Sequence, residues 1–156
     1  MEKIVLHADS AYMVSVDNFV GAICDMNHIG NYYATILMAL KEAVECAMAF
    51  EKAKQQPVGI ELMFDYCPQG VFFRVQGSQG CFQSGDFMLV RMLSDGVSLS
   101  DDASTLEISF AIRGIDYGEA AKRVSVLEHF YQPAVSRVLQ MLTGAFCRAI
   151  DNSTRI

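Results

Sequence analysis

The sequence predicts a two-layer α/β (α+β) sandwich with a mostly antiparallel sheet. Apolar residues alternate with polar ones in several short segments, which is typical of strands with one buried face. Longer segments free of Gly and Pro instead carry apolar residues three and four positions apart, which is typical of amphipathic helices. The two kinds of segment are interleaved along 156 residues without a linker or a repeat, so one domain is expected.

The first half of the chain predicts a strand followed by two helices. Residues 3–8 form the strand, and Asp9 with Ser10 provides an N-cap pair for a helix that ends near Cys24. The following segment, DMNHIGN, predicts a turn, because Asn and Gly accept left-handed dihedrals. Residues 32–54 contain neither Gly nor Pro and predict the longest helix.

The second half predicts four strands and one short helix. Alternating apolar residues on both sides of Pro68-Gln69-Gly70 predict an antiparallel hairpin. A loop rich in Gly and Ser follows, and two more strands flank the polar turn DDAS. The expected ranges are strands 60–66 and 71–75, loop 76–85, helix 86–94, and strands 96–100 and 105–113, so the element order is βααββαββ.

Two further helices are expected in residues 114–156, as a helical extension of the domain formed by residues 1–113. An apolar stripe runs from Val135 to Ile150. This stripe either packs on the chain's own sheet or pairs with a second copy, and we favour a homodimer.

The amino-acid composition limits the classes of function that we expect. The formal net charge is -6 and Lys and Arg are not clustered, so no nucleic-acid partner is expected. No run of about 18 apolar residues predicts a membrane span, and the N-terminus lacks a secretory signal, so we expect a cytoplasmic protein. The five cysteines are scattered and form no CxxC pair, which indicates neither a disulfide framework nor a zinc site.

A motif on the second helix carries a family resemblance. The stretch from Glu42 to Ala47, EAVECA, resembles the Glu-Ala-x-x-Asn-Ala box of the anti-sigma-factor serine kinases, a branch of the GHKL (histidine kinase-like) ATPase superfamily. The resemblance implies a Bergerat-type ATPase fold, proton handling by the Glu, and magnesium coordination by the Asn. Here Cys46 replaces the Asn, and a thiol is a poor ligand for magnesium.

Two more family motifs are matched in part. The family's Asp-x-Gly-x-Gly corresponds to Gln76-Gly77-Ser78-Gln79-Gly80, in which Gly80 is retained and Gln76 offers a neutral amide oxygen to adenine. The phosphate-binding Gly-x-Gly corresponds to Ser84-Gly85-Asp86, where the Asp86 carboxylate would repel a triphosphate. Five residues separate Gly80 from Asp86, where the family carries a longer lid.

The departures from these family motifs indicate a degenerate pocket with no catalytic residue, no metal and no cofactor. Its members are Glu42, Cys46, Gln76, Ser78, Gly80, Gly85 and Asp86. The expected function is regulatory binding of a sigma factor or an anti-sigma antagonist, without enzymatic activity.

Three other interpretations stay open. The chain could be an active kinase that uses ATP and magnesium, with Glu42 as the base and Gln76 contacting adenine. It could be a structural or oligomerising protein whose pocket is filled by Phe82 or Phe87. Without the resemblance, Glu42 and Asp86 would be ordinary solvated acids, and residues 77–85 a plain connector.

Overall fold

The computed structural model describes residues 1–113. The elements are β1 (Glu2–Leu6), α1 (Tyr12–Asn27), the 3-10 helix η1 (Gly30–Tyr32), α2 (Tyr33–Lys52), β2 (Ile60–Cys67), β3 (Gly70–Gln76), α3 (Met88–Leu93), β4 (Gly96–Leu99) and β5 (Thr105–Ala111). The predicted order βααββαββ is confirmed, with η1 added before α2. The expected helical extension, residues 114–156, and its apolar stripe lie outside the described residues.

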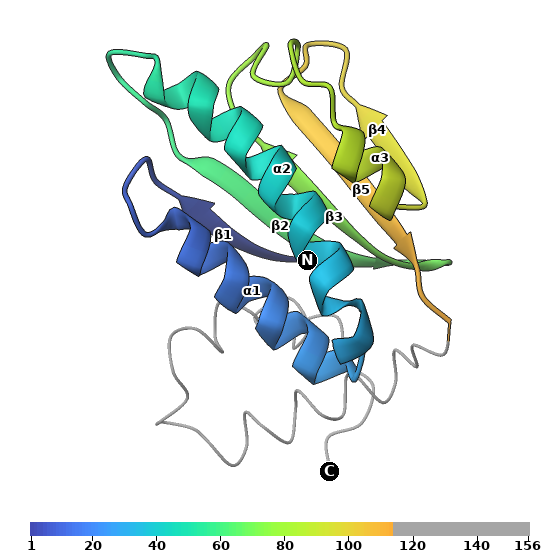
Figure 1. Cartoon of the computed structure of the whole chain (residues 1–156). Helices are drawn as coiled ribbons and strands as arrows, with labels where there is room; N and C mark the ends of the chain where they lie inside the picture. Colours follow the sequence, from blue (N-terminus) through green and yellow to red (C-terminus); the bar gives the residue numbers. More distant parts are fainter. Residues whose placement is uncertain (114–156) are drawn as a thin grey trace.

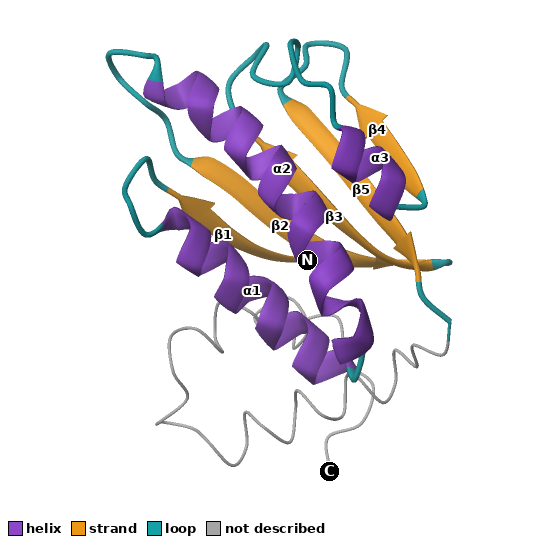
Figure 2. Ribbon diagram, viewed as in Figure 1, coloured by secondary structure: helices purple, strands orange, loops and turns teal. Residues whose placement is uncertain are grey.

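The five strands form one sheet in the order β1-β2-β3-β5-β4, and every neighbouring pair is antiparallel. All three α-helices lie on one face of this sheet (Figure 1). Figure 2 shows the resulting helix layer in front of the strand layer. The predicted two-layer α+β architecture is therefore confirmed, and among the strands of residues 1–113 β1 and β4 lie at the two edges of the sheet.

The hydrophobic core lies between the helices and the sheet, and Phe73 of β3 is at its centre. Its ring centroid lies 5.3 Å from that of Phe64 on β2, 6.1 Å from Phe110 on β5 and 6.5 Å from Phe19 on α1. Burying one such side chain contributes about 1.5–3 kcal/mol. This aromatic group therefore ties α1 to three strands.

The predicted helix faces are also the buried ones. Val16, Phe19, Val20 and Ile23 of α1 are buried, as are Ile36, Leu37, Leu40, Val44, Ala47 and Met48 of α2. Among the helices of residues 1–113, none is long and apolar enough to cross a membrane.

The predicted N-cap of the first helix is wrong. The helix begins at Tyr12, with Ala11 at the N-cap position and no side-chain cap. Asp9 instead accepts a 2.9 Å hydrogen bond from the Ala11 N–H. The Asp side chain thus stabilises a turn before the helix, an alternative that short polar side chains commonly offer the backbone.

The first helix also runs further than predicted, through Asn27. The side-chain amide of Asn27 donates to the Ile23 carbonyl at 2.8 Å, and its oxygen accepts from the Tyr66 hydroxyl at 2.6 Å. These two bonds pair the buried carboxamide and extend the helix beyond Cys24. His28, with φ of 54°, takes the left-handed conformation that we expected from Asn or Gly.

The third helix is shorter than predicted, because it begins at Met88 and not at Asp86. Phe87 precedes it in a left-handed conformation with φ of 53°, which interrupts a helical path through residue 86. The Phe87 ring is buried as a result, and Asp86 stays exposed outside the helix.

Candidate functional site

The predicted site residues lie on the C-terminal half of α2, at the end of β3 and on the loop of residues 77–87. Figure 1 shows this loop leading into α3, which lies beside α2. The hydrogen-bond partners of the side chains and backbone groups in this region decide which ligands it can bind.

Glu42 connects α2 to α3. Its Oε2 atom accepts a 2.7 Å hydrogen bond from the backbone N–H of Val90, the third residue of α3. N–H groups in the first turn of a helix have no partner within the helix, and a carboxylate there is favourable. Glu42 therefore already makes a structural contact with the helix end at which the resemblance implies a phosphate.

Cys46 lies one turn further along α2. Its thiol lies 3.6 Å from the carbonyl oxygen of Cys81, to which it donates. Burial raises the pKa of the Cys46 thiol, and the charge of Glu42 raises it further. A protonated thiol that donates to a carbonyl is not a ligand for magnesium, so Cys46 joins α2 to the loop instead.

The loop uses its own backbone donors. The N–H groups of Gly77, Gly80 and Phe82 donate at 2.8–3.0 Å to carbonyls of residues 102–104, in the turn between β4 and β5. Within the loop, further N–H groups donate to the carbonyls of Ser78, Gly80 and Phe82; these donors are Cys81, Gln83 and Gly85. A phosphate cradle needs backbone N–H groups that point at the ligand, and these six point at protein carbonyls.

Glu51 accepts a hydrogen bond from a seventh backbone N–H of the loop, that of Ser78. It is fully buried near the end of α2, where its Oε1 accepts from the Ser78 N–H and its Oε2 from the Val58 N–H, both at 3.1 Å. The Lys54 ammonium lies 3.5 Å from Oε2. Burial alone would raise the pKa of Glu51, but the hydrogen bonds from Ser78 and Val58 and the charge of Lys54 lower it below its ordinary value.

Gln76 faces away from the other site residues. Side chains alternate between the two faces of a strand, and the buried Val75 faces the helices. Gln76, the last residue of β3, therefore points to the opposite face of the sheet, where it is exposed. The structure does not bring Gln76 together with Glu42 and Cys46.

Two aromatic rings fill the space beside the loop. Phe82 is 1% exposed and Phe87 is 5% exposed, and their ring centroids lie 5.8 Å apart in an edge-on arrangement. Gly85 makes room for one ring, because a Cβ atom there would lie 2.1 Å from Cζ of Phe87. This close approach explains Gly85 without any phosphate.

These observations test the fit of ATP and magnesium, the groups that the resemblance implies. Residues 1–113 bring together no three His, Cys, Asp or Glu side chains that could hold a metal ion. Glu42 already accepts a hydrogen bond from the Val90 N–H, and at position 46 the chain offers a thiol that donates to the Cys81 carbonyl. The N–H groups of the loop already donate to protein carbonyls. The residues present do not fit magnesium and ATP in the manner of the family.

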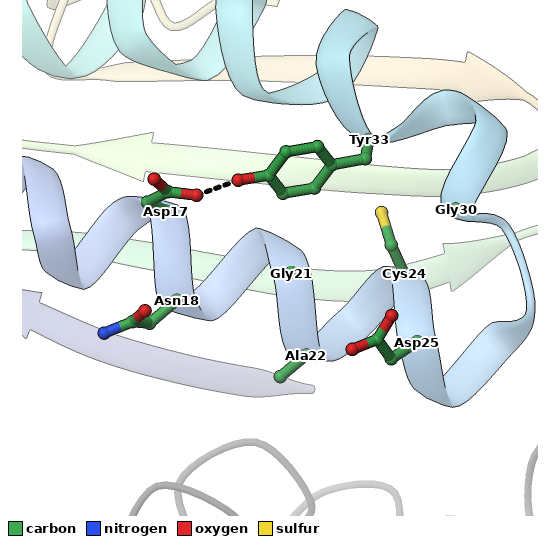
Figure 3. A pocket seen from close by; sticks show the side chains of 8 residues that line it. All are labelled: Asp17, Asn18, Gly21, Ala22, Cys24, Asp25, Gly30 and Tyr33. Carbon is green, nitrogen blue, oxygen red and sulfur yellow. Dashed lines mark hydrogen bonds between the residues drawn. The ribbon is translucent and has the colours of Figure 1, made fainter.

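A hollow with a volume of about 530 Å³ lies between α1 and the start of α2. Figure 3 shows the Tyr33 hydroxyl pointing at Asp17, to which it donates a hydrogen bond. Among residues 1–113, the lining includes two charged residues, Asp17 and Asp25, and no Lys or Arg. A hollow lined this way repels phosphate, so it offers no replacement site for a nucleotide.

Sequence reasoning missed Glu51, which holds the loop in place. Glu51 lies between Phe50 and Lys52 in the last turn of α2, a setting typical of a solvated acid. Nothing in the local pattern indicates that Ser78 and Val58 reach it from later segments. Only the tertiary structure reveals this role.

Comparison of the chain with protein-family models, curated proteins and solved structures found no match.

Proposed function

We propose that this chain is a regulatory protein-binding domain with a Bergerat-type fold, similar to an anti-sigma-factor kinase but without nucleotide turnover. The resemblance of residues 42–47 and the βααββαββ order support the family part of this proposal. The partner would be a sigma factor or an anti-sigma antagonist. The net charge of -6 favours such a protein partner over a nucleic acid.

One observation carries the proposal that turnover is lost. The backbone donors of the loop already bond to protein acceptors, namely the carbonyls of residues 102–104, carbonyls of the loop itself, and Glu51. Binding a triphosphate there would break several of these bonds and leave their acceptors unpaired, among them the carbonyls of the buried residues Phe82 and Ala103. Each buried polar group left without a partner costs about 1–3 kcal/mol, so the loop opposes nucleotide binding.

Isothermal titration of the full chain with ATP and magnesium tests this part. We expect no heat of binding at millimolar nucleotide. Micromolar binding would contradict the proposal and favour the alternative, an active serine kinase that uses Glu42.

Binding of protein partners tests the other part. The purified chain is mixed with a sigma factor, and separately with an antagonist domain, from the same cell, and complexes are separated by size-exclusion chromatography. We expect a complex that forms equally well with and without ATP and transfers no phosphate to the antagonist. Phosphate transfer that the Glu42→Gln variant abolishes would establish the kinase alternative.

A structural or oligomerising role is the second candidate, and the buried pair Phe82 and Phe87 favours it. The same chromatography separates the two. A structural protein would form no complex with either partner and would elute as an oligomer of itself.

A further inference from the structure

The neighbouring elements α3 and β4 together present an exposed apolar surface. Five large apolar side chains are exposed there: Met88 57%, Leu89 37% and Met92 71% on α3, and Val97 39% and Leu99 45% on β4. Figure 1 shows α3 and β4 side by side at one end of the sheet. Neighbouring exposed apolar residues of this kind mark interaction surfaces, and Met side chains adapt to varied partners.

The strand β4 is also an open edge. It is the last strand of the sheet, with β5 on its inner side, and no described strand pairs with its outer side. The Ser100 N–H donates to the carbonyl oxygen of Thr105 at 2.9 Å, so these two residues form a hydrogen-bonded pair. Along β4 the next residue whose N–H and C=O point at β5 is therefore Ser98, opposite Glu107. Because bonding direction alternates along a strand, the N–H and C=O groups of Val97 and Leu99 point outward.

The strand β4 has the sequence GVSL, so it carries neither Lys nor Pro, two residues with which soluble proteins often protect an edge strand. The opposite edge strand, β1, carries Lys3, which pairs with Glu61 at 3.1 Å. The two edges of one sheet therefore differ in protection.

Acidic residues surround the open edge. Asp95 precedes β4 and Asp101 with Asp102 follows it, and Arg91 is the one basic residue between positions 86 and 102. Hydrogen bonds from Ser104 and Ser100 lower the pKa of Asp102, so this carboxylate stays ionised at neutral pH. The charge around β4 therefore favours a basic partner.

We propose that β4 receives an extended protein segment as a sixth strand, and that this segment alternates apolar residues and carries Lys or Arg at its ends. Its backbone would pair with Val97 and Leu99, and its apolar side chains would pack on the Met-rich face of α3. This inference deepens the proposed function, because the segment would belong to the regulated partner.

The charges disfavour a second copy as the occupant. Two β4 strands paired antiparallel about a two-fold axis would place Asp95 of each copy near Asp101 of the other. Like charges at both ends oppose that pairing.

Hydrogen exchange measured by NMR on the full chain tests the proposal. The probe is a synthetic nine-residue peptide of alternating Val and Thr with two Lys at each end, and the control peptide has Glu in place of Lys. We expect the amides of Val97 and Leu99 to exchange at least about tenfold more slowly with the Lys peptide, and the Ser98 amide to stay unchanged. The Glu peptide should give no protection.

Substitutions sharpen the test. Val97→Pro removes an outward N–H but no bond to β5, so the fold should persist, whereas peptide binding should weaken about tenfold. The matched variant Val97→Thr keeps the N–H and should weaken binding at most about fourfold. Asp101→Lys should weaken binding several-fold, and Asp101→Asn less, with both differences shrinking at high salt.

Four outcomes would overturn the proposal. They are peptide binding that survives Val97→Pro, protection confined to β1, protection of Val97 and Leu99 that grows with protein concentration alone, and protection that is present without peptide at every concentration. The third would assign the edge to a second copy, and the fourth to residues 114–156. None of them involves the loop, so the ATP titration would still stand or fail independently.

Discussion

Replacing Glu51 by Ala tests whether this buried carboxylate fixes the loop. The change leaves the N–H groups of Val58 and Ser78 without their acceptor. Both segments lie near solvent, so each loss should cost about 1 kcal/mol, at the low end for an unpaired donor. The lost methylene adds about 0.8 kcal/mol, which brings the total to about 3 kcal/mol.

A loss of about 3 kcal/mol corresponds to a melting temperature roughly 10 °C lower for a domain of this size. Urea unfolding followed by circular dichroism measures the free energy directly. Glu45→Ala is the matched control, since Glu45 is exposed on the same helix and should change stability by less than about 0.5 kcal/mol. If Glu51→Ala matched Glu45→Ala, the proposed anchoring of the loop would be wrong.

The pH dependence of stability provides an independent check on Glu51. Its pKa is lowered in the folded chain, so the carboxylate stabilises the fold fully above the pKa of the unfolded state. That contribution falls as the pH drops through the folded pKa, beginning near about pH 5. The wild type should therefore lose more stability than Glu51→Gln between neutral pH and pH 3, and equal losses would contradict the assignment.

Two further predictions concern α2 and the thiols. Glu42→Ala should cost about 1 kcal/mol and speed hydrogen exchange at the Val90 amide, because α3 loses an acceptor at its first turn; unchanged exchange there would exclude this contact. Burial raises the pKa of Cys24 and of Cys81 to about 11, so both should resist iodoacetamide at pH 7.5 until the chain unfolds. Mass spectrometry measures the labelling, and modification of Cys81 as fast as that of the partly exposed Cys67 would refute the prediction.

The elements with a clear period were predictable from sequence. Alternating apolar residues predicted the hairpin of β2 and β3, and apolar residues three and four positions apart predicted the long helix α2. Both patterns arise because one face of each element is buried. Helix ends were not predictable in this way. Asp9 bonds to Ala11 N–H, and Asn27 bonds to Tyr66 from a distant strand, so local preference alone does not decide where α1 starts or stops.

The candidate site was predictable only as a set of positions. Spacing along a helix correctly places Glu42 and Cys46 on one side of α2, where both contact the segment that follows β3. It does not reveal the internal bonds of the loop, because the acceptors of Gly77, Gly80 and Phe82 come from a turn more than 20 residues later. Partners so far apart in sequence leave no local pattern.

The position of β1 in the sheet has a consequence for synthesis on the ribosome. Its only described neighbour is β2, and the register joins Glu2 to Phe64. The first strand must therefore wait until more than 60 residues have been made before it can join the sheet. Such long-range pairing slows folding, and it leaves the nascent N-terminal segment open to chaperones for longer than the β2–β3 hairpin, which closes over a short turn.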